Sequence, residues 1–129
     1  MKIELENEFE LLALHKVLME AKYNEKYNNI DVQGSPIVKN LCDKVFNLLI
    51  ETSSDADAKK WLEWRNLEVH SDRIPNLKNR LEKIHSSRWV PLTNEQRIEY
   101  IECLVRPLVA NEKTIKELVD YGNRAHDCY

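Results

Sequence analysis

Residues 35–55, SPIVKNLCDKVFNLLIETSSD, contain one whole predicted helix and the start of the next. Serine can cap the free amides at a helix start and proline fits the first turn, so Ser35 and Pro36 predict where the helix begins. Apolar residues then recur at steps of three and four, which is the period of an α-helix. The helix is expected to end near Thr52, and Ser54 is expected to cap the next one. The stripe predicted to face the core is Ile37, Leu41, Val45 and Leu48, widened by Val38, Cys42 and Leu49.

The same helical period recurs on both sides of this stretch. The chain has only two glycines and four prolines, whereas sheet-rich domains usually need many more glycine-dependent turns. The sequence therefore predicts an all-α fold, a compact bundle of five or six helices with short polar connections, in a single domain over residues 1–129. The predicted helices cover approximately residues 7–27, 36–52, 55–69, 74–84, 94–106 and 112–122.

Three local signals set the boundaries in the second half of the chain. Thr93-Asn94-Glu95-Gln96 matches the capping box, in which threonine and glutamine side chains each bond a free amide. Pro107 interrupts a helical pattern, so we expect a kink or break near Arg106. Asn111 can cap the last helix, and Gly122 is expected to end it in the left-handed conformation.

Composition narrows the class of protein. The chain has 129 residues, of which 43% are hydrophobic and 32% charged, as in globular domains. No apolar run reaches the ~20 residues of a membrane-spanning helix, and the acidic start does not resemble a secretory signal. The three cysteines are widely spaced, without the pairing typical of disulfide frameworks or zinc sites. We expect a cytoplasmic protein with no membrane association.

Catalytic motifs are missing from the sequence. Neither glycine lies in a phosphate-binding or nucleophile-elbow pattern. Cys42 and Cys103 lie in or beside apolar stripes, where inert buried cysteine is the usual state. We expect no cofactor and no catalysis.

Two short patterns offer metal ligands. Glu82 and His85 have the ExxH spacing of di-iron bundles, but those sites need a second ExxH, which the chain lacks. The tail His126-Asp127-Cys128 offers fewer donors than a tetrahedral site requires, and a frayed, exposed terminus is expected. His15 and His70 are interpreted as ordinary residues at the edges of helices. We therefore expect no metal site.

Two tryptophans lie three positions apart in a basic stretch, KKWLEWRN at residues 59–66. Trp64 is expected at the edge of the helix, beside Lys60, and tryptophan is enriched at interface hot spots. The predicted partner-contact residues are therefore Trp64, Lys60 and Arg65. Trp89 is expected to fill the joint between two helices. The predicted core stripe of this helix is Ala58, Trp61, Leu62 and Val69.

The distribution of charge along the chain suggests DNA binding as an alternative function. Residues 58–97 hold nine Lys/Arg against five Asp/Glu, within a chain whose net charge is −3. The segment 55–88 resembles in outline a helix-turn-helix, although its turn lacks glycine and the chain is not basic overall. The residues that would face a DNA groove are Lys78, Asn79, Arg80 and Lys83.

The acidic first quarter of the chain permits the opposite hypothesis, in which carboxylates imitate the phosphates of a nucleic acid. Glu4, Glu6, Glu8 and Glu10 alternate along the chain and could imitate a row of phosphates. Carboxylates at a helix start are also favoured simply by the helix dipole. The second interpretation is the simpler one.

These observations favour a small non-catalytic protein-interaction module, such as an adaptor, an inhibitor or a regulatory accessory protein. That class includes accessory proteins of phages and mobile elements. The expected partner is another protein, and a homo-oligomer is compatible with the sequence. The alternative is a DNA-binding transcriptional regulator that uses the helix-turn-helix-like unit.

Overall fold

The computed structural model describes residues 1–24 and 30–128, and this part of the chain is all-α. Within it, two one-turn helices, α2 (Ile30–Gln33) and α6 (Ser86–Trp89), and a 3₁₀ turn, η1 (Leu67–Val69), connect the longer elements. An isolated parallel bridge joins Asn66 to Val109, and the described residues form no sheet. The predicted fold class is confirmed. The longer helices are α1 (Glu8–Tyr23), α3 (Pro36–Thr52), α4 (Asp55–Trp64), α5 (Arg73–Lys83), α7 (Asn94–Val105) and α8 (Glu112–Ala125).

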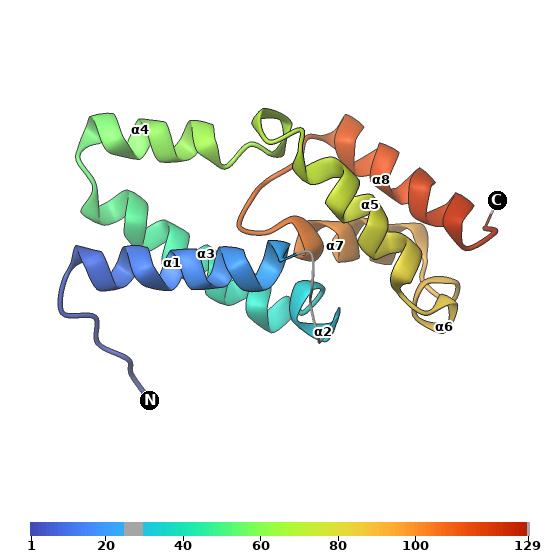
Figure 1. The fold of residues 1–129 in the computed structure, drawn as a ribbon, viewed down its shortest axis with the longest axis horizontal. Coiled ribbons are helices and arrows are strands. Elements are labelled where there is room, and N and C mark those ends of the chain that lie inside the picture. The colour runs from blue at the N-terminus through green and yellow to red at the C-terminus, as the bar shows by residue number, and fades with distance from the viewer. Residues whose placement is uncertain (25–29, 129) are drawn as a thin grey trace.

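The helices form two groups along the long axis of the molecule (Figure 1). Helices α1, α3 and α4 lie at one end, and α5 to α8 lie at the other. Packing of α3 and α2 against α7 joins the two groups. The larger cluster of buried apolar residues lies mainly among α5, α7 and α8, whereas a smaller cluster between α1 and α3 is built on Leu11, Val45 and Leu49.

The predicted helix starts are confirmed. Ser35 Oγ accepts a hydrogen bond from the Val38 amide at 3.3 Å, and Ser54 Oγ accepts one from the Asp57 amide at 3.2 Å. Thr93 and Gln96 form both bonds of the capping box, and Asn111 caps α8. Each side chain satisfies amides that have no partner within the helix.

The helix predicted over residues 55–69 is shorter than expected. It ends at Trp64 because the backbone then pairs with the segment before α8: the Val109 amide donates to the Arg65 carbonyl at 2.7 Å, and the Leu67 amide donates to the Val109 carbonyl at 2.9 Å. Leu67 is thereby buried. The first helix ends at Tyr23, and the extension predicted to residue 27 lies partly outside the described residues.

Two expectations at the C-terminal end have opposite outcomes. The break predicted near Arg106 is confirmed, since α7 ends at Val105. The left-handed cap at Gly122 is wrong, because α8 continues to Ala125 and Gly122 has no positive φ. Gly122 instead lies against the Trp89 ring: a Cβ there would be 2.6 Å from Trp89 Cζ2.

The buried faces of α3 and α4 also differ from the predicted ones. On α3 the buried residues are Cys42, Val45, Phe46 and Leu49, whereas Leu41 and Leu48 are exposed. Helix α3 is apolar around more than half of its circumference, and its neighbours cover only one side. On α4, Leu62 is exposed, and Val69 lies beyond the helix end and is exposed as well. The part of the stripe that packs against the core cluster is Trp61.

Candidate interaction surfaces

An aliphatic stripe runs along the outer side of α3. Ile37, Leu41 and Leu48 have exposed fractions of 74%, 46% and 42%. Spacings of four and seven place them on one helix face, adjacent to the buried face. These three residues are called the α3 stripe below.

One end of the α3 stripe borders a pocket. This pocket, of about 400 Å³, lies between the N-terminal segment, the start of α1 and the end of α3. Ile3, Leu5 and Leu11 line it together with Leu48. The apolar surface of the stripe therefore continues toward the N-terminal segment.

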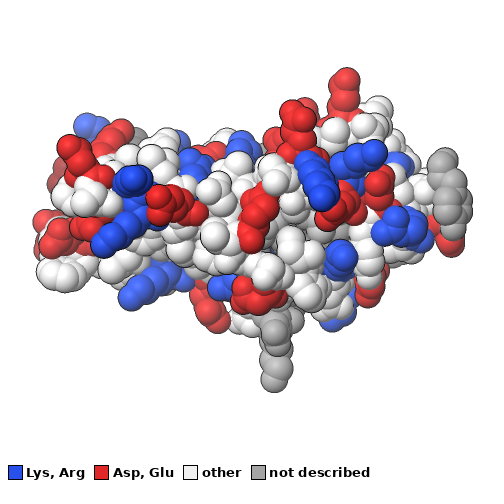
Figure 2. All heavy atoms as spheres, turned by 90° about the horizontal axis from the view of Figure 1, so that it is seen from above, with Lys and Arg blue, Asp and Glu red and all other residues white. Residues whose placement is uncertain are grey.

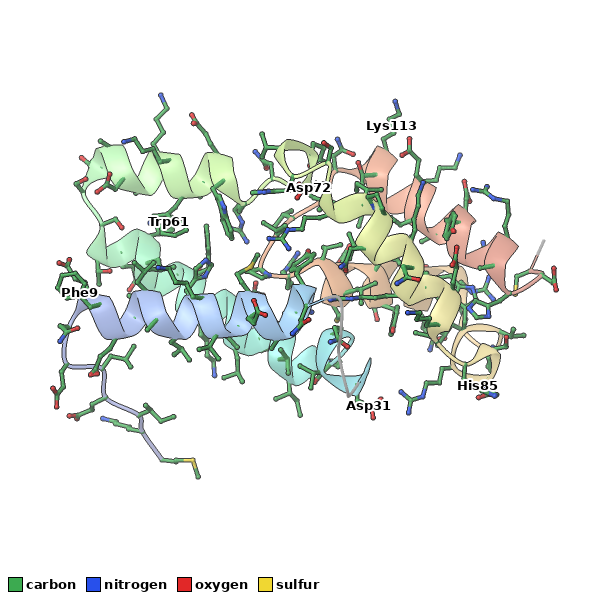
Figure 3. All side chains as sticks on the ribbon, in the orientation of Figure 1. Phe9, Asp31, Trp61, Asp72, His85 and Lys113 are labelled. Atoms are coloured by element: carbon green, nitrogen blue, oxygen red, sulfur yellow. The ribbon has the colours of Figure 1, made fainter. Side chains whose placement is uncertain are left out.

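Trp64, the first of the predicted contact residues, lies in an aromatic cluster. Its ring is 5.1 Å from His15, 5.4 Å from Trp61 and 5.3 Å from His70, measured between centroids, and it stacks on Phe46 at 6.4 Å. Figure 3 shows the labelled Trp61 between α4 and the α1–α3 pair. Aromatic pairs at these distances stabilise a fold beyond the area they bury. The contacts explain both tryptophans as the packing that holds α4 in place.

The other two contact residues differ in exposure. Lys60 is exposed on α4, whereas Arg65 is half-buried and its guanidinium lies 4.4 Å from the centre of the Phe46 ring. His15, expected at an edge, is buried against both Trp61 and Trp64, and His70 Nε2 lies 2.6 Å from the Trp64 carbonyl oxygen. The sequence missed His15 because a lone histidine on a helix does not reveal which rings surround it.

The residues of the DNA-binding alternative do not form one exposed face. Arg80 is only 1% exposed, and it donates to the Asn24 carbonyl at 3.0 Å and lies over the Tyr23 ring. The prediction that Arg80 faces a groove is therefore wrong. Lys78 is half-buried near the Tyr121 ring, and Asn79 and Lys83 are exposed.

The surface around residues 55–88 carries both positive and negative charges. Figure 2 shows basic and acidic side chains interleaved over the face that carries α4 and α8, without a continuous basic area. Nucleic-acid sites typically gather lysine and arginine on one face. The visible face lacks that pattern.

A buried polar centre closes the C-terminal end of α7. Lys22 is fully buried and donates to the carbonyl oxygens of Gln33 and Cys103, while the Tyr23 hydroxyl donates to the Val105 carbonyl at 2.6 Å. Burial lowers the pKa of Lys22 to about 8. An amine with a lowered pKa is a potential nucleophile. The Lys22 amine, however, is buried away from solvent, and its hydrogen bonds satisfy carbonyls at helix ends.

The cysteines are free thiols. Cys42 and Cys103 are buried, as their apolar stripes predicted, and burial raises the pKa of both thiols. A raised pKa lowers the fraction of reactive thiolate near neutral pH. Neither thiol has the environment of a catalytic nucleophile.

His126 and Cys128 pack against other helices, so the frayed, exposed terminus expected from the sequence is wrong for these two residues. His126 is buried, with Nδ1 2.8 Å from Ser86 Oγ and Nε2 2.8 Å from the Leu81 carbonyl oxygen. Cys128 Sγ lies 3.7 Å from an Arg97 guanidinium nitrogen. In some enzymes an imidazole activates a neighbouring hydroxyl as a nucleophile. Here the imidazole contacts a carbonyl near the end of α5 and links α6 to α8.

The predicted ExxH pair and the carboxylates at the start of α1 have local structural roles. His85 is exposed and its side chain caps α6, while Glu82 accepts a hydrogen bond from the Tyr121 hydroxyl. Within residues 1–24 and 30–128, no three His, Cys, Asp or Glu side chains are placed to hold a metal ion. Glu8 and Glu10 lie in the first turn of α1, where the helix dipole favours carboxylates.

Comparison of the chain with known proteins identifies no related protein. No family model, no curated protein and no solved structure matches the chain. Among the described helices, none combines the length and apolar character needed to cross a membrane. The surface features of the chain itself are thus the basis for a functional proposal.

Proposed function

We propose that the chain is a non-catalytic protein-interaction module and that the α3 stripe is its contact surface. Such a module would act as an adaptor, an inhibitor or a regulatory accessory protein. The observation that carries the proposal is the exposure of Ile37, Leu41 and Leu48 on one face of a well-packed helix.

Single exposed apolar residues are common on protein surfaces, but a row of them on one helix face is typical of interaction sites. Helix α3 is also anchored by the buried residues Phe46 and Leu49 on the neighbouring face. A rigid helix loses little conformational freedom on binding, which favours affinity. The α4 residues Trp64 and Arg65 contribute to the fold, so α3 is the better candidate for the contact surface.

The test uses the chain as bait in a lysate of cells that produce it naturally, followed by calorimetry with the purified partner. A variant with Ile37→Ser, Leu41→Ser and Leu48→Ser is expected to lose about tenfold or more in affinity, since each contact can contribute about 1 kcal/mol. Its melting temperature should change little, because the three side chains are exposed.

The matched control carries Leu62→Ser and Val69→Ser, whose exposed fractions are 49% and 67% on other elements. This control should bind like the unchanged protein. Equal binding by the α3 variant, or an equal loss in the control, would contradict the proposal. Lys60→Ala tests the α4 surface separately, and a titration of duplex DNA at low salt tests the regulator alternative.

A further inference from the structure

A groove lies along the seam between α7 and α8, which pack side by side (Figure 1). Its volume is about 530 Å³, within the size range of pockets that hold drug-sized ligands. It is formed by different helices from the α3 stripe.

The floor of the groove is apolar and preformed. Ile115 and Val119, one turn apart on α8, are buried, and Ile98 on α7 is half-buried beside them. Because both helices are packed into the larger core, the floor needs no rearrangement to receive a ligand.

The rim of the groove is acidic at both ends. One end of the rim lies near the connection between the two helices and carries Glu102 of α7 and Glu112 of α8. The other end carries Asp120, which lies two turns further along α8. Lys116 is the single basic residue among those lining the groove. No ion pair between described residues neutralises the three carboxylates.

The spacing of the carboxylates indicates the shape of the ligand. At 1.5 Å per residue, Glu112 and Asp120 are separated by about 12 Å along α8. Two basic residues seven positions apart on another helix are separated by about 10 Å, and apolar residues at the third and fourth positions between them lie on the same face. Long basic side chains can therefore reach both ends while the apolar pair covers Ile98 and Ile115.

We propose that the α7–α8 groove is a docking site for a short, basic, amphipathic helix of a partner protein. Apolar anchors would enter the groove and the basic residues would meet the rim carboxylates, the usual division of roles when a helix binds in a groove. The inference rests on the proposed function only in assigning protein binding to the chain. Its variants do not touch the α3 stripe, so the two proposals can fail separately.

The probe is a fluorescein-labelled peptide of alanine with lysines at positions i and i+7 and leucines at i+3 and i+4, titrated by anisotropy. Binding is expected at low salt and should weaken as salt rises. Two comparison peptides, one with glutamate for lysine and one with alanine for leucine, are expected not to bind. Methyl signals of Ile98 and Ile115 in nuclear magnetic resonance spectra should shift on addition of the lysine–leucine peptide.

The decisive variant is Glu102→Gln with Asp120→Asn, which removes rim charge while keeping side-chain shape. It is expected to weaken binding about threefold or more. The matched control is Glu99→Gln with Glu117→Gln, which removes two carboxylates of the same helices that do not line the groove, and it should bind like the unchanged chain.

Three outcomes would overturn the proposal. The first is no binding of the lysine–leucine peptide at about 1 mM, the weak end of measurable affinity. The second is an equal loss in both carboxylate variants, which would show unspecific attraction. The third is a loss of peptide binding as the protein concentration rises, which would show that a second copy of the chain occupies the groove.

Discussion

At the scale of single residues, Gly122 and Trp89 show how one contact decides a conformation. Trp89 is fully buried, and its ring lies where a side chain on residue 122 would project. Its indole nitrogen donates to Asn123 Oδ1 at 3.1 Å, which fixes the orientation of the ring. The glycine is therefore required for close approach within a helix.

Gly122→Ala is expected to destabilise the protein. Alanine normally stabilises a helix interior by about 1 kcal/mol relative to glycine, but overpacking costs about 1–3 kcal/mol. A new Cβ 2.6 Å from Trp89 Cζ2 cannot be relieved by moving a buried ring, so the second effect should dominate. Urea unfolding measures the difference. Lys116→Ala, an exposed position on the same helix, should change little, and a stabilised Gly122→Ala variant would contradict the packing.

His15 is expected to make stability depend on pH. Burial and the neighbouring Lys16 lower the pKa of His15, so the native state binds fewer protons than the unfolded state below about pH 6.5. Its contribution to stability is therefore present above about pH 6.5 and is lost as the pH falls from there through the lowered pKa of the folded state. Urea unfolding at pH 7.5 and pH 5.5 should show the difference, and His15→Phe, which keeps an aromatic ring, should reduce it. An equal pH dependence in both proteins would exclude His15 as the cause.

At the scale of secondary-structure elements, side chains from distant segments satisfy backbone groups at helix ends, in addition to the local caps. Lys22 and Tyr23 of α1 satisfy carbonyls at the end of α7. Glu68 accepts a hydrogen bond at 2.6 Å from the amide of Asn111 at the start of α8. These contacts fix the helices relative to one another as well as ending them.

The capping box of α7 is a purely local device, and Thr93→Ala is expected to cost about 1 kcal/mol. The Gln96 amide would lose its 3.1 Å bond to Thr93 Oγ1. In a domain of this size, the melting temperature should fall by about 3 to 5 °C. Thr52→Ala is the control, since Thr52 is exposed and its hydroxyl bonds the Leu48 carbonyl within α3. Equal melting temperatures for both variants would show that the box contributes nothing.

At the scale of the whole molecule, the two core clusters differ greatly in size. Among the residues that the structure describes, the larger contains thirteen buried apolar residues and the smaller contains three. Helix α4 contains no buried residue and is held by its two half-buried tryptophans. Stability is therefore expected to be unequal along the long axis.

Native-state hydrogen exchange should reveal this inequality. Amides of α4 are expected to exchange faster than those of α7 and α8, because fewer buried contacts oppose local opening of α4. The measurement is residue-resolved exchange under native conditions. Equal protection of α4 and α7 would instead indicate one cooperative unit.

Local chemistry predicted much of this architecture. The all-α class, the starts of α3, α4, α7 and α8 and the break at Pro107 all follow from caps, proline and the helical period, which act within a few residues. The burial of Trp89, Cys42 and Cys103 also followed from their position in apolar segments.

The tertiary structure alone decided which faces are covered. Helix α3 has more apolar surface than one contact can bury, so its period could not show that Phe46 would be buried and Ile37 exposed. The role of Arg80, the setting of His15 and the α7–α8 groove likewise depend on residues distant in sequence. Helical spacing fixes the face on which a side chain lies, but only the packing of helices decides whether that face meets the core, a partner or water.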